Sequence, residues 1–169
     1  MLVRRARRGY GATLVSRFKY FQSVDADYAA TIDANSQHDP RYIPALIEPI
    51  KAGESDIVIR SRFLEKERDQ APWIKIQGIK LLNKLIEWRV GVKLTDSQSG
   101  YRAYRVCNLM PEKLIETGMG ISTEILIKAI KNGLKITEVP VQISHYERIQ
   151  YLPLLRHGVS VLYSTLKNV

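Results

Sequence analysis

The sequence predicts an α/β protein, because short apolar runs typical of buried strands alternate with longer stretches of helical periodicity. Residues 28–33 and 56–60 are the clearest strands, and residues 72–89 are the clearest helix. We find neither internal repeats nor a low-complexity linker. Strands separated by helices indicate a largely parallel sheet in one domain.

The first half of the chain contains three expected elements. We expect a basic helix at residues 11–21, followed by a strand at residues 28–33 that ends on a carboxylate. A helix is expected next, with Asp39 as its N-cap and Pro40 at its first position, and it should end before Gly53. The apolar stripe of this helix consists of Ile43, Leu46, Ile47 and Ile50.

The second half begins with the strand at residues 56–60, and Pro72 then opens the long helix. Ser122 is expected to cap a helix that closes at Gly133, before a strand at residues 135–143. Apolar residues of the long helix lie on one face: Ile76, Ile79, Leu82 and Ile86. The closing segment shows the same spacing at Leu152, Leu155, Val159, Leu162 and Leu166.

Composition excludes several classes of protein. With 169 residues, 45% apolar and 25% charged, the chain can bury roughly two-thirds of its unfolded surface without a disulfide or metal. Cys107 is the single cysteine, so an internal disulfide and a cysteine-rich zinc site are excluded. No apolar run reaches the roughly 20 residues of a membrane span, and the Arg-rich start lacks a signal-peptide core. We therefore expect an intracellular protein.

The net charge of +9 is concentrated at the two ends. Residues 1–24 carry six basic residues and residues 148–169 carry three, and neither segment has an acid. Residues 25–147 carry 17 of each sign and are neutral. Basic ends suit an anionic lipid surface, a phosphorylated ligand or nucleic acid, and the alternative is that they only promote solubility.

A polar cluster, D-A-N-S-Q-H-D, follows the first strand. Asp33, Asn35 and Gln37 place oxygen ligands two residues apart, which suits Mg²⁺ or Mn²⁺. The alternative is that Asp33 caps a turn and Asp39 caps the helix. The three histidines show no zinc-binding spacing.

Two further clusters follow later strands or helices. Residues 96–102, D-S-Q-S-G-Y-R, combine a glycine turn with an Asp and an Arg, which act on phosphates and hydroxyls or form a structural pair. Arg62 follows the strand at residues 56–60 and is suited to bidentate phosphate binding or to an ordinary surface position.

These clusters together resemble the second part of family-2 glycosyltransferases, particularly the dolichol-phosphate mannosyltransferase and glucosyltransferase branch that acts on polyprenyl phosphates. The resemblance covers residues 8–146 and is carried by seven stretches in register. They are R-G-Y-G-A at 8–12, D-Y-A-A-T-I-D-A-N-S-Q-H-D-P at 27–40, I-P at 43–44, D-I-V-I-R-S-R-F at 56–63, P-W-I-K-I-Q-G-I-K-L-L-N at 72–83, D-S-Q-S-G-Y-R-A at 96–103, and T-E-I-L-I-K-A-I-K-N-G-L-K-I-T-E-V-P-V at 123–141.

The resemblance implies a three-layer α/β/α nucleotide-diphospho-sugar transferase fold of the GT-A type, N-terminally truncated. Residues 1–147 form the partial catalytic domain, without the family's first two β-α units, and residues 148–169 form a C-terminal amphipathic helix. A fragment or half of a split protein is then expected to self-associate or to bind a complementing chain.

The resemblance also implies roles for individual residues. Asp33, Asn35 and Gln37 are the metal ligands for Mg²⁺ or Mn²⁺, although Asn35 replaces the usual second aspartate of the family's D-x-D motif. Asp96 is the catalytic residue that orients the sugar or serves as base. Glu124 and Glu138 are expected either to hold other site residues in place or to be structural, and the position of Glu138 in a strand before Pro140 favours the structural role. The acceptor phosphate is assigned to Arg62, Lys75 and Arg102, and further substrate contacts to Ser99, Gly100 and His38.

The implied reaction transfers a sugar, with inversion, from a UDP- or GDP-sugar to a polyprenyl phosphate. The enzyme is expected at the cytoplasmic face of the membrane as a peripheral protein, docked by its basic start and its final segment. One alternative is a non-catalytic remnant that binds a sugar nucleotide, a lipid phosphate or a partner chain. A nucleic-acid partner is not expected, because interleaved aromatics, a zinc pattern and a recognition helix are missing.

Overall fold

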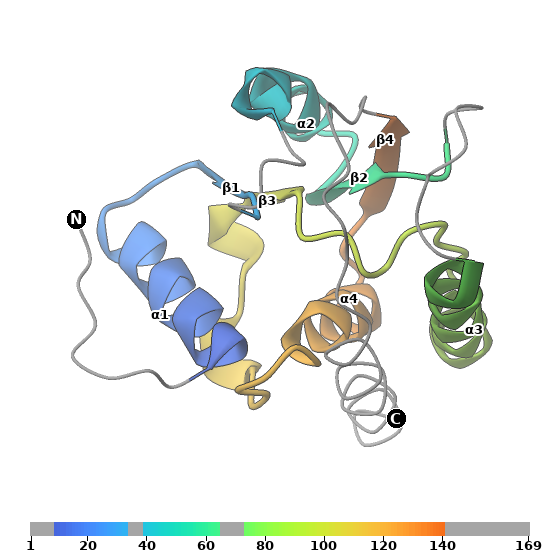
Figure 1. Cartoon of the computed structure of the whole chain (residues 1–169). Coiled ribbons are helices and arrows are strands. Elements are labelled where there is room, and N and C mark those ends of the chain that lie inside the picture. The colour runs from blue at the N-terminus through green and yellow to red at the C-terminus, as the bar shows by residue number, and fades with distance from the viewer. Residues whose placement is uncertain (1–8, 34–38, 65–72, 141–169) are drawn as a thin grey trace.

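The computed structural model describes residues 9–33, 39–64 and 73–140. In these residues a four-stranded sheet is covered by helix α2 on one face and by helices α1 and α4 on the other, as Figure 1 shows. The strands are β1 (Tyr28–Thr31), β2 (Ile57–Ser61), β3 (Arg102–Arg105) and β4 (Ile136–Pro140). The α-helices are α1 (Tyr10–Ser23), α2 (Ile43–Lys51), α3 (Trp73–Val90) and α4 (Ile121–Lys131). Short 3₁₀ helices are η1 (Pro40–Tyr42), η2 (Val106–Asn108) and η3 (Pro111–Lys113).

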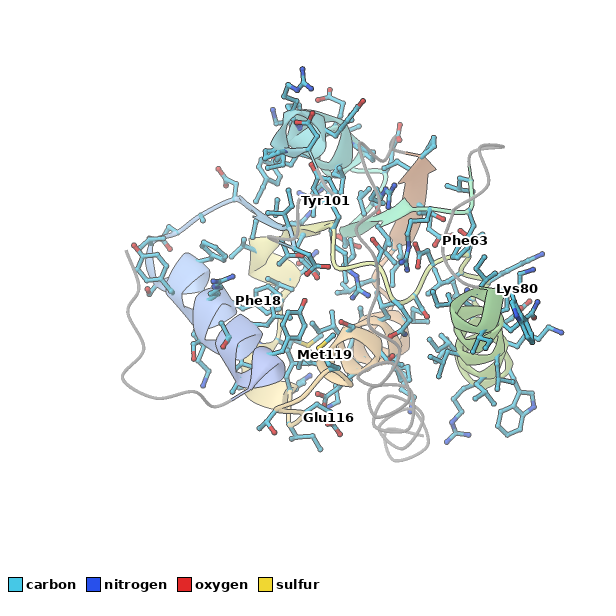
Figure 2. All side chains as sticks on the ribbon, viewed as in Figure 1. Phe18, Phe63, Lys80, Tyr101, Glu116 and Met119 are labelled. Atoms are coloured by element: carbon cyan, nitrogen blue, oxygen red, sulfur yellow. The ribbon has the colours of Figure 1, made fainter. Side chains whose placement is uncertain are left out.

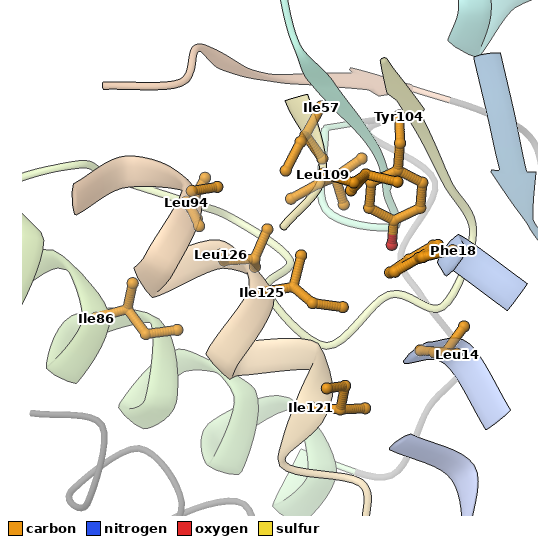
Figure 3. Packing of buried hydrophobic residues seen from close by; sticks show 12 residues of the cluster. Leu14, Phe18, Ile57, Ile86, Leu94, Tyr104, Leu109, Ile121, Ile125 and Leu126 are labelled. Atoms are coloured by element: carbon orange, nitrogen blue, oxygen red, sulfur yellow. The ribbon is translucent and has the colours of Figure 1, made fainter. Parts of the chain in front are cut away.

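Apolar clusters on the two faces of the sheet produce the three layers. Successive side chains of a strand point to opposite faces, so Ile57 and Ile59 join one cluster while Val58 joins the other. The larger cluster joins the sheet to α1, α3 and α4 (Figure 3), and in it the rings of Phe18 and Tyr104 meet edge to face with centroids 5.1 Å apart. The smaller cluster joins the sheet to α2 through Leu46, Ile50, Val58, Tyr101 and Ala103.

The sheet is mixed, so the prediction of a largely parallel sheet is wrong. The strand order is β1-β3-β2-β4, and β3 is antiparallel to both of its neighbours, whereas β2 and β4 are parallel. The reason lies in the turn after α3. Thr95 and Asp96 lie beside the carboxyl end of β2, where the Oγ of Ser61 is 2.6 Å from the Oγ1 of Thr95. The chain therefore re-enters the sheet from that end and must run against β2.

Most expected elements are confirmed, with small differences at their ends. Helix α1 is longer than expected, and β1 ends two residues before Asp33. Ser122 does not cap α4, which begins at Ile121 after Gly120. Strand β3 was not expected, and only its first residue, Arg102, lies in the polar cluster at 96–102. The expected helix at 148–169 and the last three residues of the strand at 135–143 lie outside the described residues.

Helix α3 buries the face that its sequence predicts. Ile79, Leu82 and Ile86 are buried and Ile76 is half-buried, whereas Lys80 and Lys84 are exposed. Asp39 caps η1 through a bond from the Arg41 amide, as expected of an N-cap before proline. Of the helices that the structure describes, none has the length and apolar content of a membrane span.

Candidate functional site at one end of the sheet

The carboxyl end of β1 brings Asp33 against the glycine of the second polar cluster. The hydroxyl of Thr31 donates a 2.8 Å hydrogen bond to the carbonyl oxygen of Gly100, which fixes that turn beside the strand. A Cβ atom at Gly100 would lie 2.3 Å from Oδ2 of Asp33. Only glycine leaves room for the carboxylate there, so the two motifs share one space.

The carboxyl end of β2 brings Arg62 to Asp96. The Nε and a terminal nitrogen of Arg62 each donate 2.7 Å hydrogen bonds to the two carboxylate oxygens, and the Arg62 amide donates a third bond of 3.1 Å. The Asp96 side chain is fully buried, and that of Arg62 is 11% exposed. This bidentate geometry is the strong form of an arginine–carboxylate pair. Arg62 also lies over the ring of Phe63, with its guanidinium carbon 5.7 Å from the ring centroid.

The turn at residues 95–99 is held from two sides. Glu138 of β4 accepts hydrogen bonds from the amides of Thr95 and Asp96, at 2.7 and 2.8 Å. Asn83 of α3 donates to the Thr95 carbonyl at 2.6 Å and accepts from the Ser97 amide at 3.1 Å. The structural role expected for Glu138 is thereby confirmed, because its carboxylate positions the backbone that carries Asp96.

Arg102 is buried at the start of β3 and binds backbone carbonyls. Its guanidinium donates to the carbonyl oxygens of Ser99, Ser122 and Ser97, at 2.8, 2.9 and 2.7 Å. This side chain is only 2% exposed. Arg102 thus ties the turn to the first residues of α4, and a phosphate-binding role for it stays a prediction.

Tyr10 at the start of α1 lies in the same neighbourhood. Burial raises the pKa of Tyr10, and the negative charge of Asp33 raises it further, whereas Arg102 and a hydrogen bond with Ser122 act in the opposite direction. The charge of the Asp33 carboxylate therefore acts on the Tyr10 hydroxyl. Figure 2 shows how the side chains of α1, α4 and the β3 segment fill the space beneath this end of the sheet.

The segment at residues 115–118 fixes the position of Tyr10. Glu124 of α4 is fully buried and accepts bonds from the amides of Ile115 and Glu116, and it also pairs with Lys128 at 2.6 Å. The structural role expected for Glu124 is confirmed. The carbonyl of Thr117 in turn accepts a 2.9 Å bond from the amide of Gly11.

Two glycines flank Tyr10 because the segment at 115–118 passes so close. A Cβ atom at Gly9 or at Gly11 would lie 2.4 Å from a backbone carbonyl oxygen of that segment. Gly9 also has a φ of 90°, a conformation that favours glycine. The stretch R-G-Y-G-A thus seats the first turn of α1 on the loop before α4.

The loop before α2 meets the site through Tyr101. Its hydroxyl donates a 2.9 Å bond to the Asp39 carbonyl, and burial, followed by the charge of Asp39, raises the Tyr101 pKa. Asp39 also accepts bonds from the backbone and guanidinium of the exposed Arg41, which lower the pKa of the Asp39 carboxyl. Tyr101 therefore anchors the chain at the end of the segment that carries the rest of the D-A-N-S-Q-H-D cluster.

The described structure brings together six of the predicted site residues. Asp33 contacts Gly100, Arg62 binds Asp96, and Arg102 holds the turn between them. The Oγ of Ser99 accepts a 3.3 Å bond from the Tyr101 amide. Three predicted residues, Asn35, Gln37 and His38, lie outside the described residues, as does the side chain of Lys75 in α3. Within the described residues, no three His, Cys, Asp or Glu side chains converge to hold a metal ion.

Sequence reasoning did not assign two residues that shape this site. Asn83 is a polar residue on the buried face of α3, and a polar side chain in an apolar stripe is the signal that could have found it. Tyr10 is the residue between the two glycines of R-G-Y-G-A, and its position indicates a closely packed turn. Both belong to stretches that carry the family resemblance.

Comparison with known proteins agrees with that resemblance. The model of the family described as Glycosyl transferase family 2 matches residues 2–109. A UDP-N-acetylglucosamine–dolichyl-phosphate N-acetylglucosaminyltransferase of Methanococcus voltae is 34% identical over 143 residues, covering 83% of this chain and 57% of the relative. A dolichol-phosphate mannosyltransferase of Pyrococcus furiosus is 32% identical over 147 residues, covering 82% of this chain and 39% of the relative. The chain thus spans little more than half, or less, of these curated relatives.

Solved structures share the fold. Glucosyl-3-phosphoglycerate synthase from Mycobacterium tuberculosis, in complex with phosphoglyceric acid, superposes with a TM-score of 0.69 at 21% identity. The match covers 99% of this chain and 56% of that one. Another structure of the synthase contains Mn²⁺, uridine diphosphate and phosphoglyceric acid, with the same TM-score at 19% identity. The expected GT-A type fold, spanning part of the whole domain, is confirmed.

Proposed function

Because the chain belongs to glycosyl transferase family 2, we propose that it transfers a sugar from a nucleoside-diphosphate sugar to a polyprenyl phosphate. The observation that carries the proposal is the contact between Asp33 and Gly100, which joins the two polar motifs at the carboxyl ends of β1 and β2. In α/β sheets this is the edge at which ligands bind. The dolichyl-phosphate transferases among the relatives support a lipid phosphate as acceptor.

Of the residues proposed to hold a divalent cation, the described part of the structure contains Asp33. The glycine at position 100 leaves space that a Cβ would fill, and the Asp33 carboxylate occupies the edge of that space. Asp33, Asn35 and Gln37 are the residues proposed to hold Mg²⁺ or Mn²⁺, which prefer carboxylate and amide oxygens. When bound, such an ion would offset the negative charge on the diphosphate of the leaving group.

The acceptor in this proposal needs positioning more than activation. A lipid monophosphate has a second pKa of about 6, so at neutral pH it is already anionic and one of its oxygens can attack the anomeric carbon without a strong base. The bond from that carbon to the nucleoside diphosphate then breaks, and the diphosphate leaves with the electron pair. Arg62 and Lys75 are proposed to hold the acceptor phosphate in line for this attack.

Asp96 orients Arg62 in this scheme. Its buried carboxylate accepts hydrogen bonds from Nε and one terminal nitrogen, which form one edge of the Arg62 guanidinium, so the arginine is held at the end of β2 in one orientation. Ser99, Gly100 and His38 are proposed to contact substrate from the same side. The role of Asp96 toward the sugar, as orienting group or base, stays part of the proposal.

Titration calorimetry of UDP, GDP and their sugar conjugates into the purified chain, with and without Mn²⁺, tests the donor site. We expect metal-dependent binding that Asp33→Asn abolishes and that Asp25→Asn leaves unchanged. Asp25 is an exposed aspartate at the end of α1 with a φ of 50°, a conformation that asparagine adopts readily, so it is a matched control. Absence of binding by a folded chain would contradict the proposal.

The alternative of a non-catalytic binding protein is favoured by one observation in the sequence. Asn35 stands where the family usually has a second aspartate, which removes one negative charge from the metal ligands. Metal-dependent nucleotide binding without transfer to any polyprenyl phosphate would support this alternative. Asn35→Asp would then be expected to tighten metal binding and to restore transfer.

The partners proposed from the sequence include a membrane and another chain. The lipid acceptor supports a peripheral position at the cytoplasmic membrane face, with the basic end segments in contact with anionic lipid. In the described sheet, β1 pairs with β3 on one side and has no described strand on its other side. That edge is the proposed site for self-association or for a complementing chain, and size-exclusion chromatography with light scattering tests it.

A further inference from the structure

Helix α3 presents two apolar faces, and only one of them packs against the part of the protein that the structure describes. The outward face has large apolar side chains that are more than half exposed: Trp73 at 70%, Ile74 at 51%, Leu81 at 56% and Trp88 at 77%. Figure 1 shows α3 at the periphery of the molecule, and Figure 2 shows its side chains projecting away from the sheet, with Lys80 among them. An exposed apolar surface of this kind marks a site of interaction.

The outward face is a continuous seam. Ile74, Gly78, Leu81, Leu85 and Trp88 follow one another at spacings of four and three residues. At 3.6 residues per turn these positions lie within about 40° of one line along the helix, which runs roughly 115° around the helix from the line through Ile79, Leu82 and Ile86. From Ile74 to Trp88 the seam, called here the α3 seam, is about 21 Å long, whereas the 18-residue helix is about 27 Å long.

Basic residues flank the α3 seam. The helix contains Lys75, Lys80, Lys84 and Arg89 against a single acid, Glu87, which gives it a net charge of +3. Lys80, Lys84 and Arg89 are exposed. Trp88 ends the seam, and Trp73 precedes it at a position about 100° around the helix from Ile74. Tryptophan, lysine and arginine beside an apolar surface are the pattern of a helix that lies in the interface of a membrane. The positive charge complements anionic lipid head groups.

The opposite side of α3 connects this surface to the candidate site. Asn83 is on the buried side, and it binds the backbone of Thr95 and Ser97 in the turn that carries Asp96. A surface that contacts the α3 seam is therefore one helix diameter from that turn, about 10 Å. The helix sets the distance between whatever it docks on and the end of the sheet.

We propose that the α3 seam is a membrane-docking surface, which places its apolar side chains among the head groups of an anionic lipid bilayer. The inference goes beyond the proposed transfer reaction and does not depend on it, because it concerns a surface away from Asp33 and needs no acceptor. Charge selects the occupant: a second copy of this helix would bring two faces of net +3 together, whereas an anionic bilayer attracts them.

The two tryptophans of the chain, Trp73 and Trp88, both lie on α3, so tryptophan emission, excited selectively over that of the nine tyrosines, reports on this helix alone. The experiment adds vesicles of phosphatidylcholine, with or without one-third phosphatidylglycerol and free of polyprenyl phosphate, to the full chain. With the anionic vesicles we expect a shift of the emission to shorter wavelength that salt weakens, together with co-sedimentation. Sugar transfer is measured separately, so a failure to bind vesicles can be distinguished from a failure of the proposed transfer reaction.

A matched pair of variants completes the test. Ile74→Gln with Leu81→Gln keeps both tryptophans and should weaken vesicle binding by roughly tenfold or more, because two apolar side chains no longer enter the interface. Val24→Gln with Ile115→Gln changes two side chains of equal exposure, 51% and 60%, outside α3 and should leave binding unchanged. Circular dichroism confirms that both variants fold.

Three results would overturn the proposal. Co-sedimentation with unchanged tryptophan emission would mean that another segment, such as a basic end, binds the vesicles. A wavelength shift that depends on protein concentration without lipid would identify a second copy as the occupant. Equal loss of binding in both pairs of variants would show that the α3 seam has no special role.

Discussion

Two loops of this protein, at residues 95–99 and 115–118, are held by the same hydrogen-bond arrangement but contact different parts of the molecule. In each, one glutamate accepts hydrogen bonds from two successive backbone amides: Glu138 for the first loop and Glu124 for the second. The first loop carries Asp96 to the end of β2. The second packs against the glycines at the start of α1.

The difference lies in what else the two carboxylates and their loops contact. Glu124 is fully buried and its charge is balanced by Lys128 on the next turn of α4. Glu138 is half-buried, and its loop contains a second acid, Asp96, which is balanced by Arg62. A buried glutamate is therefore not in itself a sign of catalysis. Here both are scaffolds, and only the first loop presents groups at the sheet edge where the motifs meet.

Removing the Glu124 carboxylate should have the largest effect on stability. Glu124→Ala leaves the amides of Ile115 and Glu116 without their acceptor and Lys128 without its counter-charge. We expect a loss of about 3–5 kcal/mol in the free energy of unfolding, measured by urea denaturation. Glu112→Ala, at an exposed position of η3, is the control and should cost less than about 0.5 kcal/mol.

A methyl group at Gly11 should be the next most harmful change. Its Cβ would meet the Glu116 carbonyl oxygen at 2.4 Å, and this backbone atom is fixed by the same loop that Glu124 holds. Gly11→Ala should therefore lower the free energy of unfolding by about 1–3 kcal/mol. Gly78→Ala is the matched control in α3, where nothing lies within 4 Å, and alanine should stabilise that helix by up to about 1 kcal/mol. Equal stability of the two variants would contradict the close packing of α1.

Replacing each of the two glutamates by glutamine tests most directly which loop contributes to the proposed reaction and which contributes only to stability. Glutamine keeps one acceptor oxygen and places an NH₂ group against the second amide, so Glu138→Gln and Glu124→Gln should each cost about 1–2 kcal/mol in unfolding free energy. Only Glu138→Gln disturbs the loop that holds Arg62 through Asp96. We expect it alone to lower kcat/KM for transfer beyond the effect of its stability loss. If both variants transfer sugar equally well, the loop at 95–99 has no part in the reaction.

The sequence predicts the elements of this fold better than their directions. Apolar runs and helical periodicity identify β1, β2 and the inner face of α3, because those patterns reflect burial within one element. The direction of β3 depends on where the chain turns after α3, and that turn is fixed by contacts with Ser61 and Glu138, which are 34 and 42 residues away from their partners. Long-range hydrogen bonds of this kind leave no periodic signal.

The candidate site is predictable in its composition and only partly in its geometry. The motif spacing, with the family resemblance, selected Asp33, Asp96 and Arg62, and the structure places them at one end of the sheet. The sequence did not predict that Arg62 binds Asp96 or that Arg102 binds backbone carbonyls. The sequence does not distinguish an arginine that binds a phosphate from one that binds groups of its own protein, since the guanidinium uses the same N–H donors in both cases.

A methyl group at Gly100 should have the smallest effect on stability and still disturb the proposed donor site. Its Cβ would meet the Asp33 carboxylate, which is the end of a side chain and can rotate away, unlike the carbonyl oxygen that faces Gly11. We therefore expect Gly100→Ala to cost less than about 1 kcal/mol in unfolding free energy. Because the carboxylate must leave its place, metal-dependent nucleotide binding should weaken toward the loss expected of Asp33→Asn, which calorimetry measures. Nucleotide binding at the original strength would mean that Asp33 does not hold the metal from its position beside Gly100. Gly11→Ala and Gly100→Ala would then differ only in how much the added methyl group destabilises the fold.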